Sequence, residues 1–104
     1  MLQADVFVMS PSKDHPTLRY FLSYRGTGVP LNFCEELAPD ALRHRNTYFR
    51  AGYDSAGRML WCEKMVYEEV EMRHDYTWDA TGRLTQAMIT VGEEEPQVLR
   101  LRAA

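Results

Sequence analysis

The sequence predicts a mainly β fold: a single antiparallel meander of about six or seven strands, strongly curved or partly closed. A seven-residue phrase of aromatic, Asp, two small residues, Gly, Arg and apolar residue occurs twice, at 53–59 and 78–84. The stretches between turn signals carry strand patterns, and only 35–45 has a helical character. Several strands are apolar on both faces, so the second face requires a cover. The candidates are the N-terminal segment, the 37–45 connection, strong curvature or another copy of the chain.

The doubled phrase predicts two hairpin turns. Asp54 and Asp79 can accept hydrogen bonds from backbone N–H groups two residues ahead. Gly57 and Gly82 can adopt the positive φ that closes a type I turn with a bulge. The Asp and Arg residues of the phrase are therefore expected to shape turns and strand ends, and not to perform catalysis.

The strands expected from alternation and turn signals cover residues 19–25, 29–34, 46–53, 59–66, 70–78, 84–91 and 97–102. Pro30 has no N–H to donate, which favours a sheet edge for the second strand. Pro39 limits the helical part to at most one short turn near 38–45. Residues 1–16 contain a polar, proline-bearing stretch and are predicted to form a loosely attached strand or arm.

The composition describes one β-rich domain over residues 1–104. A chain of 104 residues with 45% hydrophobic and 26% charged side chains is typical of a folded protein that needs no metal or disulfide. The N-terminus lacks a basic signal region and no apolar run approaches a bilayer span, which predicts a cytoplasmic protein without a membrane partner. Cys34 and Cys62 are expected to be buried free thiols.

Charge disfavours a nucleic-acid partner. The net charge is −3, and no basic stripe follows a predicted strand or helix. The acidic side chains gather at 68–71 and 93–95, where they are expected to lie on solvated turns. The connection at 43–50 is the most basic part of the chain.

The hairpin phrases resemble the YD repeats of large Rhs-type bacterial proteins, whose units read tyrosine, Asp, two variable residues, Gly, Arg and Leu. The resemblance covers residues 48–90 and implies structural hairpins, which in that family build a β-shell around other segments. Two units are too few for a shell, so local hairpin geometry is what carries over. The whole chain, through 19–26 and 45–48, resembles a family of small uncharacterised bacterial proteins, and this resemblance implies no activity.

The sequence leaves catalysis open and favours a non-enzymatic role. Three histidines and two cysteines show no close ligand spacing, so neither a metal nor another cofactor is expected. A nucleophilic pair of Cys62 with His74, or Cys34 with His44, is possible only through the fold, and neither cysteine has an activating sequence context.

The candidate binding residues are polar and aromatic, and they are Arg25, His44, Arg45, Asn46, Tyr48 and Arg50. Arginine and tyrosine are favoured where a surface binds a carboxylate, a phosphate or a protein. The favoured hypothesis is an interaction module that binds a protein partner or itself through an edge strand or an apolar second face. The alternative is a pocket that holds a small anion with the 43–50 segment. A third interpretation pairs these residues with local carboxylates on a sheet face.

Overall fold

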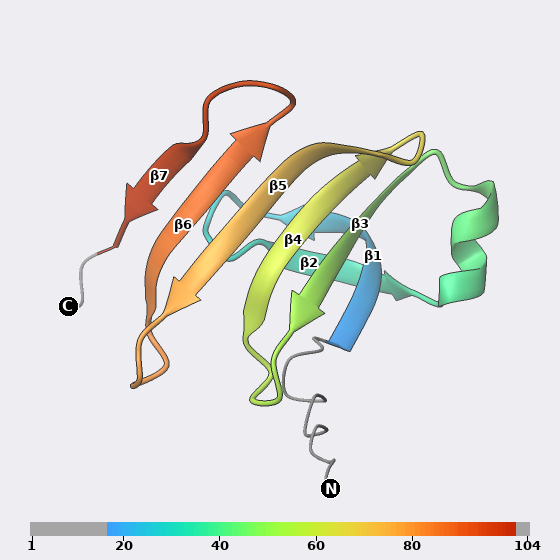
Figure 1. Cartoon of the computed structure of the whole chain (residues 1–104). Coiled ribbons are helices and arrows are strands. Elements are labelled where there is room, and N and C mark those ends of the chain that lie inside the picture. Colours follow the sequence, from blue (N-terminus) through green and yellow to red (C-terminus); the bar gives the residue numbers. More distant parts are fainter. Residues whose placement is uncertain (1–16, 102–104) are drawn as a thin grey trace, which may run out of the picture.

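The structure is a computed structural model of the chain and describes residues 17–101. It contains one seven-stranded antiparallel sheet with the strand order β2-β1-β3-β4-β5-β6-β7, shown in Figure 1. The elements are β1 (Thr17–Arg25), β2 (Asn32–Leu37), the 3-10 helix η3 (Pro39–His44), β3 (Thr47–Tyr53), β4 (Met59–Val66), β5 (Glu69–Trp78), β6 (Leu84–Val91) and β7 (Gln97–Arg100). The predicted meander and its single helical turn are confirmed. The arm expected at 1–16 lies outside the described residues.

The sheet is open. Strands β2 and β7 form its two edges and do not pair with each other within the described residues. From β3 onward, each strand pairs with the next one in the chain, and β1 lies between β2 and β3. Closure of the sheet, one of the forms predicted from the sequence, is therefore not observed.

The second strand begins and ends later than predicted. Gly26 adopts a φ of 74°, and the chain between β1 and β2 forms a loop that delays the strand until Asn32. The strand then continues to Leu37 through residues that looked helical in the sequence. A bidentate ion pair joins the two strands there, in which Arg19 donates to the Glu36 carboxylate at 2.9 and 2.6 Å.

The first copy of the doubled phrase forms the predicted turn. The Asp54 side-chain Oδ1 accepts hydrogen bonds from the backbone N–H groups of Ala56 and Arg58, both at 2.9 Å. Gly57 takes a φ of 85°, and its N–H donates to the Asp54 carbonyl at 3.0 Å. These bonds to the ionised carboxylate, above all the one from the Arg58 backbone, lower the pKa of Asp54.

The second copy repeats this geometry. Asp79 Oδ1 accepts from the backbone N–H groups of Thr81 and Arg83 at 2.9 and 3.0 Å, and Gly82 also has a φ of 85°. In both hairpins the strand register also shifts beside the turn, between Gly52 and Tyr53 in the first and between Thr77 and Trp78 in the second. The turn prediction is therefore confirmed at both sites.

One face of the sheet carries the hydrophobic core, formed by Phe21, Leu31, Phe49, Ala51, Met59, Cys62, Tyr76 and Ala87. Leu31 belongs to the loop between β1 and β2, and its N–H donates to the Tyr76 hydroxyl at 3.2 Å. Phe33 from β2 stacks on Phe21, with ring centroids 4.8 Å apart. The β1–β2 hairpin therefore lies across the core face, as Figure 1 shows, and covers part of it.

Replacing Gly57 or Gly82 with alanine will destabilise the protein by about 1–2 kcal/mol, because the left-handed conformation brings Cβ close to the backbone. An added Cβ meets no atom within 4 Å at either glycine, so the effect comes from the backbone alone. Gly28→Ala is the matched control, since Gly28 is equally open and lies outside the positive-φ region. Urea unfolding measures the three variants, and equal losses at all three sites would contradict the turn assignment.

Candidate functional site

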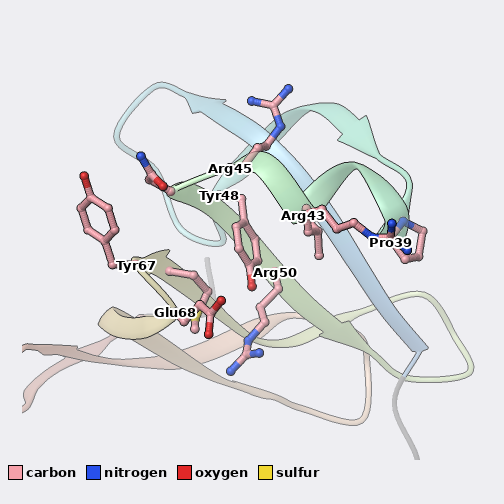
Figure 2. A pocket seen from close by; sticks show the side chains of 10 residues that line it. Pro39, Arg43, Arg45, Tyr48, Arg50, Tyr67 and Glu68 are labelled. Atoms are coloured by element: carbon pink, nitrogen blue, oxygen red, sulfur yellow. The ribbon is translucent and has the colours of Figure 1, made fainter.

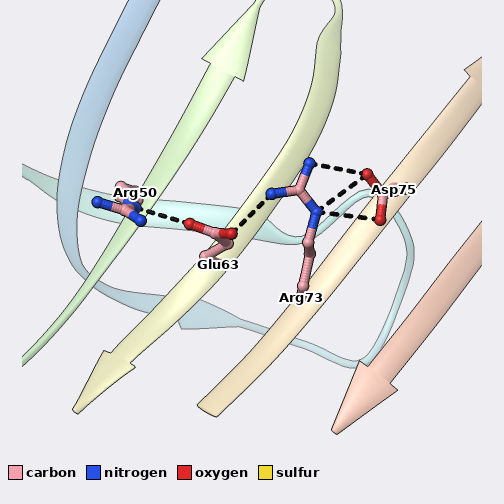
Figure 3. Close-up of polar contacts among 4 residues, drawn as sticks. All are labelled: Arg50, Glu63, Arg73 and Asp75. Atoms are coloured by element: carbon pink, nitrogen blue, oxygen red, sulfur yellow. Dashed lines mark hydrogen bonds and ion pairs between the residues drawn. The ribbon is translucent and has the colours of Figure 1, made fainter. Parts of the chain in front are cut away.

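The face opposite the core carries a row of charges, shown in Figure 3. Arg50, Glu63 and Arg73 lie directly opposite one another on β3, β4 and β5. The Glu63 carboxylate, whose residue is only 5% exposed, accepts from Arg50 Nε at 2.7 Å and from Arg73 Nη1 at 2.6 Å. Arg73 Nη2 also donates to Asp75 at 2.9 Å. We call these four residues the charged ladder. Arg50 is thus paired with a local carboxylate, as the third interpretation of the sequence expected.

The charged ladder also fixes the indole ring of Trp61. The guanidinium of Arg73 lies 4.9 Å from the centre of that ring, a cation–π contact. The opposite residue on β3 is Gly52, where an added Cβ would lie only 2.6 Å from Trp61 Nε1. The hydrogen bonds that Arg73 donates, first to Asp75 and then to Glu63, raise the pKa of Arg73. The charged side chains and the Trp61 ring on this face are therefore held in place by their contacts with one another.

A concavity of about 600 Å³ lies beside the charged ladder, and Figure 2 shows the side chains around it. We call it the hollow. Its lining residues come from η3, the link between η3 and β3, the first half of β3, the end of β4 and the β4–β5 turn. They are Pro39, Leu42, Arg43, Arg45, Asn46, Tyr48, Arg50, Met65, Tyr67 and Glu68. Tyr48 and Met65 pair across β3 and β4, and each lies two residues from Arg50 or Glu63, so they share a face with the charged ladder. The hollow and the ladder meet at Arg50.

The structure brings together four of the six predicted binding residues. Those lining the hollow are Arg45, Asn46, Tyr48 and Arg50. Arg25 does not line it, because it ends β1 opposite the start of β2. His44 does not line it either, although both of its chain neighbours do.

The hollow has a basic surplus. Within residues 17–101 no carboxylate forms an ion pair with Arg43 or Arg45, while Arg50 is bound to Glu63. Glu68 is the one acidic side chain in the lining. Figure 2 shows the guanidinium groups of the three arginines pointing in different directions. The three guanidinium groups therefore do not converge on one point in the structure.

Tyr67 is the aromatic residue of the hollow that the sequence did not predict. Tyr67 is 71% exposed and forms a two-residue turn with Glu68, with φ values of 49° and 66°. Such turns favour Asn-Gly, because side chains rarely adopt this conformation. The Tyr67 N–H donates to the Asn46 carbonyl at 2.7 Å, which ties the turn to the predicted segment. The sequence feature that could have identified Tyr67 is its position, because a bulky aromatic residue stands in the turn expected between strands 59–66 and 70–78.

The proposed Cys62–His74 pair exists in space but is not activated. The two residues lie opposite each other on β4 and β5. The Tyr76 hydroxyl lies 2.7 Å from His74 Nδ1 and 3.7 Å from Cys62 Sγ. Burial raises the pKa of Cys62 to about 11, whereas a nucleophilic cysteine needs a lowered pKa. The prediction of a buried free thiol is confirmed for Cys62, and Cys34 is free but only half-buried.

Neither a metal site nor a membrane-spanning helix is found within residues 17–101. No group of three or more His, Cys, Asp or Glu side chains in this range is arranged to bind a metal ion. No helix in the same range combines the length and apolar character needed to cross a bilayer.

Stability will depend on pH through His74. Burial lowers the pKa of His74 below its ordinary value of 6.5, with Asp75 opposing the shift. The unfolded chain then binds the proton more tightly, so the free energy of unfolding decreases as the pH falls below about 6.5. Urea unfolding between about pH 8 and 5 will show a steeper decrease for the wild type than for His74→Gln. Identical pH profiles would contradict this origin.

Gly52→Ala will displace the Trp61 ring, because no space exists for a Cβ at Gly52. We expect a shifted Trp61 fluorescence emission and a destabilisation of about 1–3 kcal/mol from overpacking. The measurement is made in a Trp78→Phe background so that Trp61 alone reports. Gly28→Ala in the same background is the control, and an unchanged emission in the Gly52 variant would exclude the described packing.

Comparison with known proteins assigns the chain to a family. Searches of curated proteins and of solved structures found no match. The profile of a family of unknown function, DUF6156, matches residues 13–104, which is most of the chain. The uncharacterised family expected from the sequence is consistent with this match. The chain belongs to DUF6156, a family of unknown function.

Proposed function

We propose that this protein is a small interaction module that docks a protein partner on the hollow and the adjoining charged ladder. The observation that carries the proposal is the hollow itself, where two arginines without ion pairs in the described residues lie beside an exposed tyrosine. Arginine, tyrosine and methionine are enriched in protein interfaces, and all three types line the hollow.

Charge complementarity defines the partner. The protein carries a net charge of −3, yet the lining of the hollow holds three arginines against one glutamate. Leu42, Met65 and the two tyrosines add apolar and aromatic surface between the charges. A chain segment with carboxylates around an aromatic or aliphatic anchor matches this mixture.

The alternative is a small anion held by the same arginines, and the same basic surplus supports it. The orientation of the side chains favours the protein partner. Arg50 is already bound to Glu63, and Arg43 and Arg45 point away from a common centre in Figure 2. A small anion would have to draw these groups together, whereas an extended segment can contact them separately.

Finer expectations from the sequence stay predictions. Equal geometry at the Asp54 and Asp79 turns supports hairpins of the YD type. The bond between Leu31 and Tyr76, which joins the first hairpin to the far strands, supports a strongly curved sheet. We also propose a cytoplasmic location and a protein partner in preference to nucleic acid, in line with the acidic net charge.

Selection from a display library of short random peptides tests the proposal. We expect enrichment of acidic sequences with an aromatic or aliphatic anchor. The double variant Arg43→Glu/Arg45→Glu will bind the selected peptides at least about tenfold more weakly, because two favourable charge contacts become repulsive. Arg25→Glu/Arg100→Glu is the matched control, since both arginines lie outside the lining and the net charge changes by the same amount. If both variants lost the same affinity for the peptides, net charge alone would explain the loss and the hollow would not be the binding site.

Inorganic phosphate separates the two candidates. Chemical-shift titration with phosphate should show no saturable response in the hollow if the site binds chain segments. The Tyr67→Ala variant should weaken peptide binding, because it removes the exposed ring. Saturable phosphate binding that requires Arg43 and Arg45, without any selected peptide, would replace the proposal with the anion pocket.

A further inference from the structure

Strand β7 leaves one edge of the sheet unpaired in the described part of the chain. It pairs with β6, and the ladder continues past its end because the Leu101 N–H donates to the Thr85 carbonyl at 2.8 Å. All four β7 residues are exposed, including Val98 at 46% and Leu99 at 40%. A free edge with apolar side chains on both faces is a template for pairing with another strand.

The other edge is less suited to pairing. In the middle of β2, Glu35 takes a φ of 57°, which interrupts the extended backbone. Its neighbour Glu36 is held by Arg19. An irregular backbone and charged side chains are common ways of protecting an edge strand. Of the two edges, β7 is therefore the one open to another strand.

The hydrogen-bond pattern of β7 identifies which backbone groups face outward. In an antiparallel ladder, residues alternate between bonding one neighbour and bonding the other. The bond from Leu101 to Thr85 means that Leu99 also directs its N–H and carbonyl toward β6. Val98 and Arg100 therefore direct theirs away from the sheet.

We propose that a second copy of this chain binds here, with the two β7 strands antiparallel across a twofold axis normal to the sheet. Val98 then exchanges backbone hydrogen bonds with the partner's Arg100, and Leu99 faces the partner's Leu99 on the axis. This register uses all four outward N–H groups of the pair. A register centred on Val98 would instead place Arg100 opposite Pro96, which has no N–H to donate.

The central contact continues the core of each copy. Leu99 lies opposite Ala87, which is fully buried, and Ala87 lies opposite the core residue Tyr76. Leu99 is thus on the core face at the end of a buried row. Residues that face each other without exchanging hydrogen bonds have Cα atoms about 4.5 Å apart, so the two leucines pack closely.

The charge at the end of β7 favours antiparallel over parallel pairing. Antiparallel pairing brings the start of each β7 beside the end of the other. In this register Arg100 lies opposite the partner's Val98, whereas an in-register parallel pairing would place the two Arg100 side chains beside each other, and like charges side by side are unfavourable.

This proposal does not rest on the proposed function. Strand β7 lies on the side of the sheet away from η3 and the hollow, as Figure 1 shows. Loss of self-association and loss of peptide binding are therefore separable by variants at the two places.

Sedimentation equilibrium over a range of protein concentrations tests the dimer. We expect the wild type to fit a monomer–dimer equilibrium and Leu99→Lys to weaken dimerisation at least about tenfold, because two ammonium groups would face each other on the axis. Val70→Lys is the matched control, since Val70 is similarly exposed at 43% on β5. A monomer at every concentration, or a dimer that Leu99→Lys leaves unchanged, would overturn the proposal.

Disulfide formation tests the register in a Cys34→Ser background, where the native thiol left is the buried Cys62. Leu99→Cys should give a rapid cross-linked dimer under mild oxidation, because the two positions face each other. Val98→Cys should cross-link far more slowly, since it would face the partner's Arg100. Faster cross-linking at Val98 would overturn the register, and cross-linking at neither site would overturn the pairing.

Discussion

The register set by the Asp-centred turns is the constraint on which the rest of the molecule depends. Side chains alternate between the two faces of a strand, so a slip of one residue would exchange those faces. Cys62 is buried in the core, and its neighbour Glu63 lies between two arginines on the other face. A slip would place a carboxylate in the core and remove it from the arginines. By fixing how β3 meets β4 and how β5 meets β6, Asp54 and Asp79 keep both surfaces intact.

Local chemistry made much of the fold predictable, and distant contacts explain the rest. The Asp–Gly turns and the helical turn at Pro39 depend on residues a few positions apart, and these predictions hold. The predicted bounds of the second strand were wrong because its start depends on the preceding loop. In that loop the Leu31 N–H donates to Tyr76, which is 45 residues away in the sequence. The burial of Glu63 likewise depends on arginines from two other strands, which its local sequence does not reveal.

The same distinction applies to the candidate site. Arg45, Asn46, Tyr48 and Arg50 are neighbours in sequence, and they were predicted together for that reason. Tyr67 joins them because of the β3–β4 pairing, which returns the chain to the same end of the sheet. Composition and charge could identify this basic segment and its Tyr48, but only the strand pairing places Tyr67 beside it.

The β4–β5 turn has a consequence for how this surface can change. Two residues with side chains hold a left-handed conformation there, which costs about 1–2 kcal/mol for each relative to glycine. Replacing Tyr67 and Glu68 with Asn-Gly would therefore stabilise the fold. The same replacement would remove the most exposed aromatic ring of the hollow. Backbone stability and the chemistry of the exposed surface therefore oppose each other at this turn.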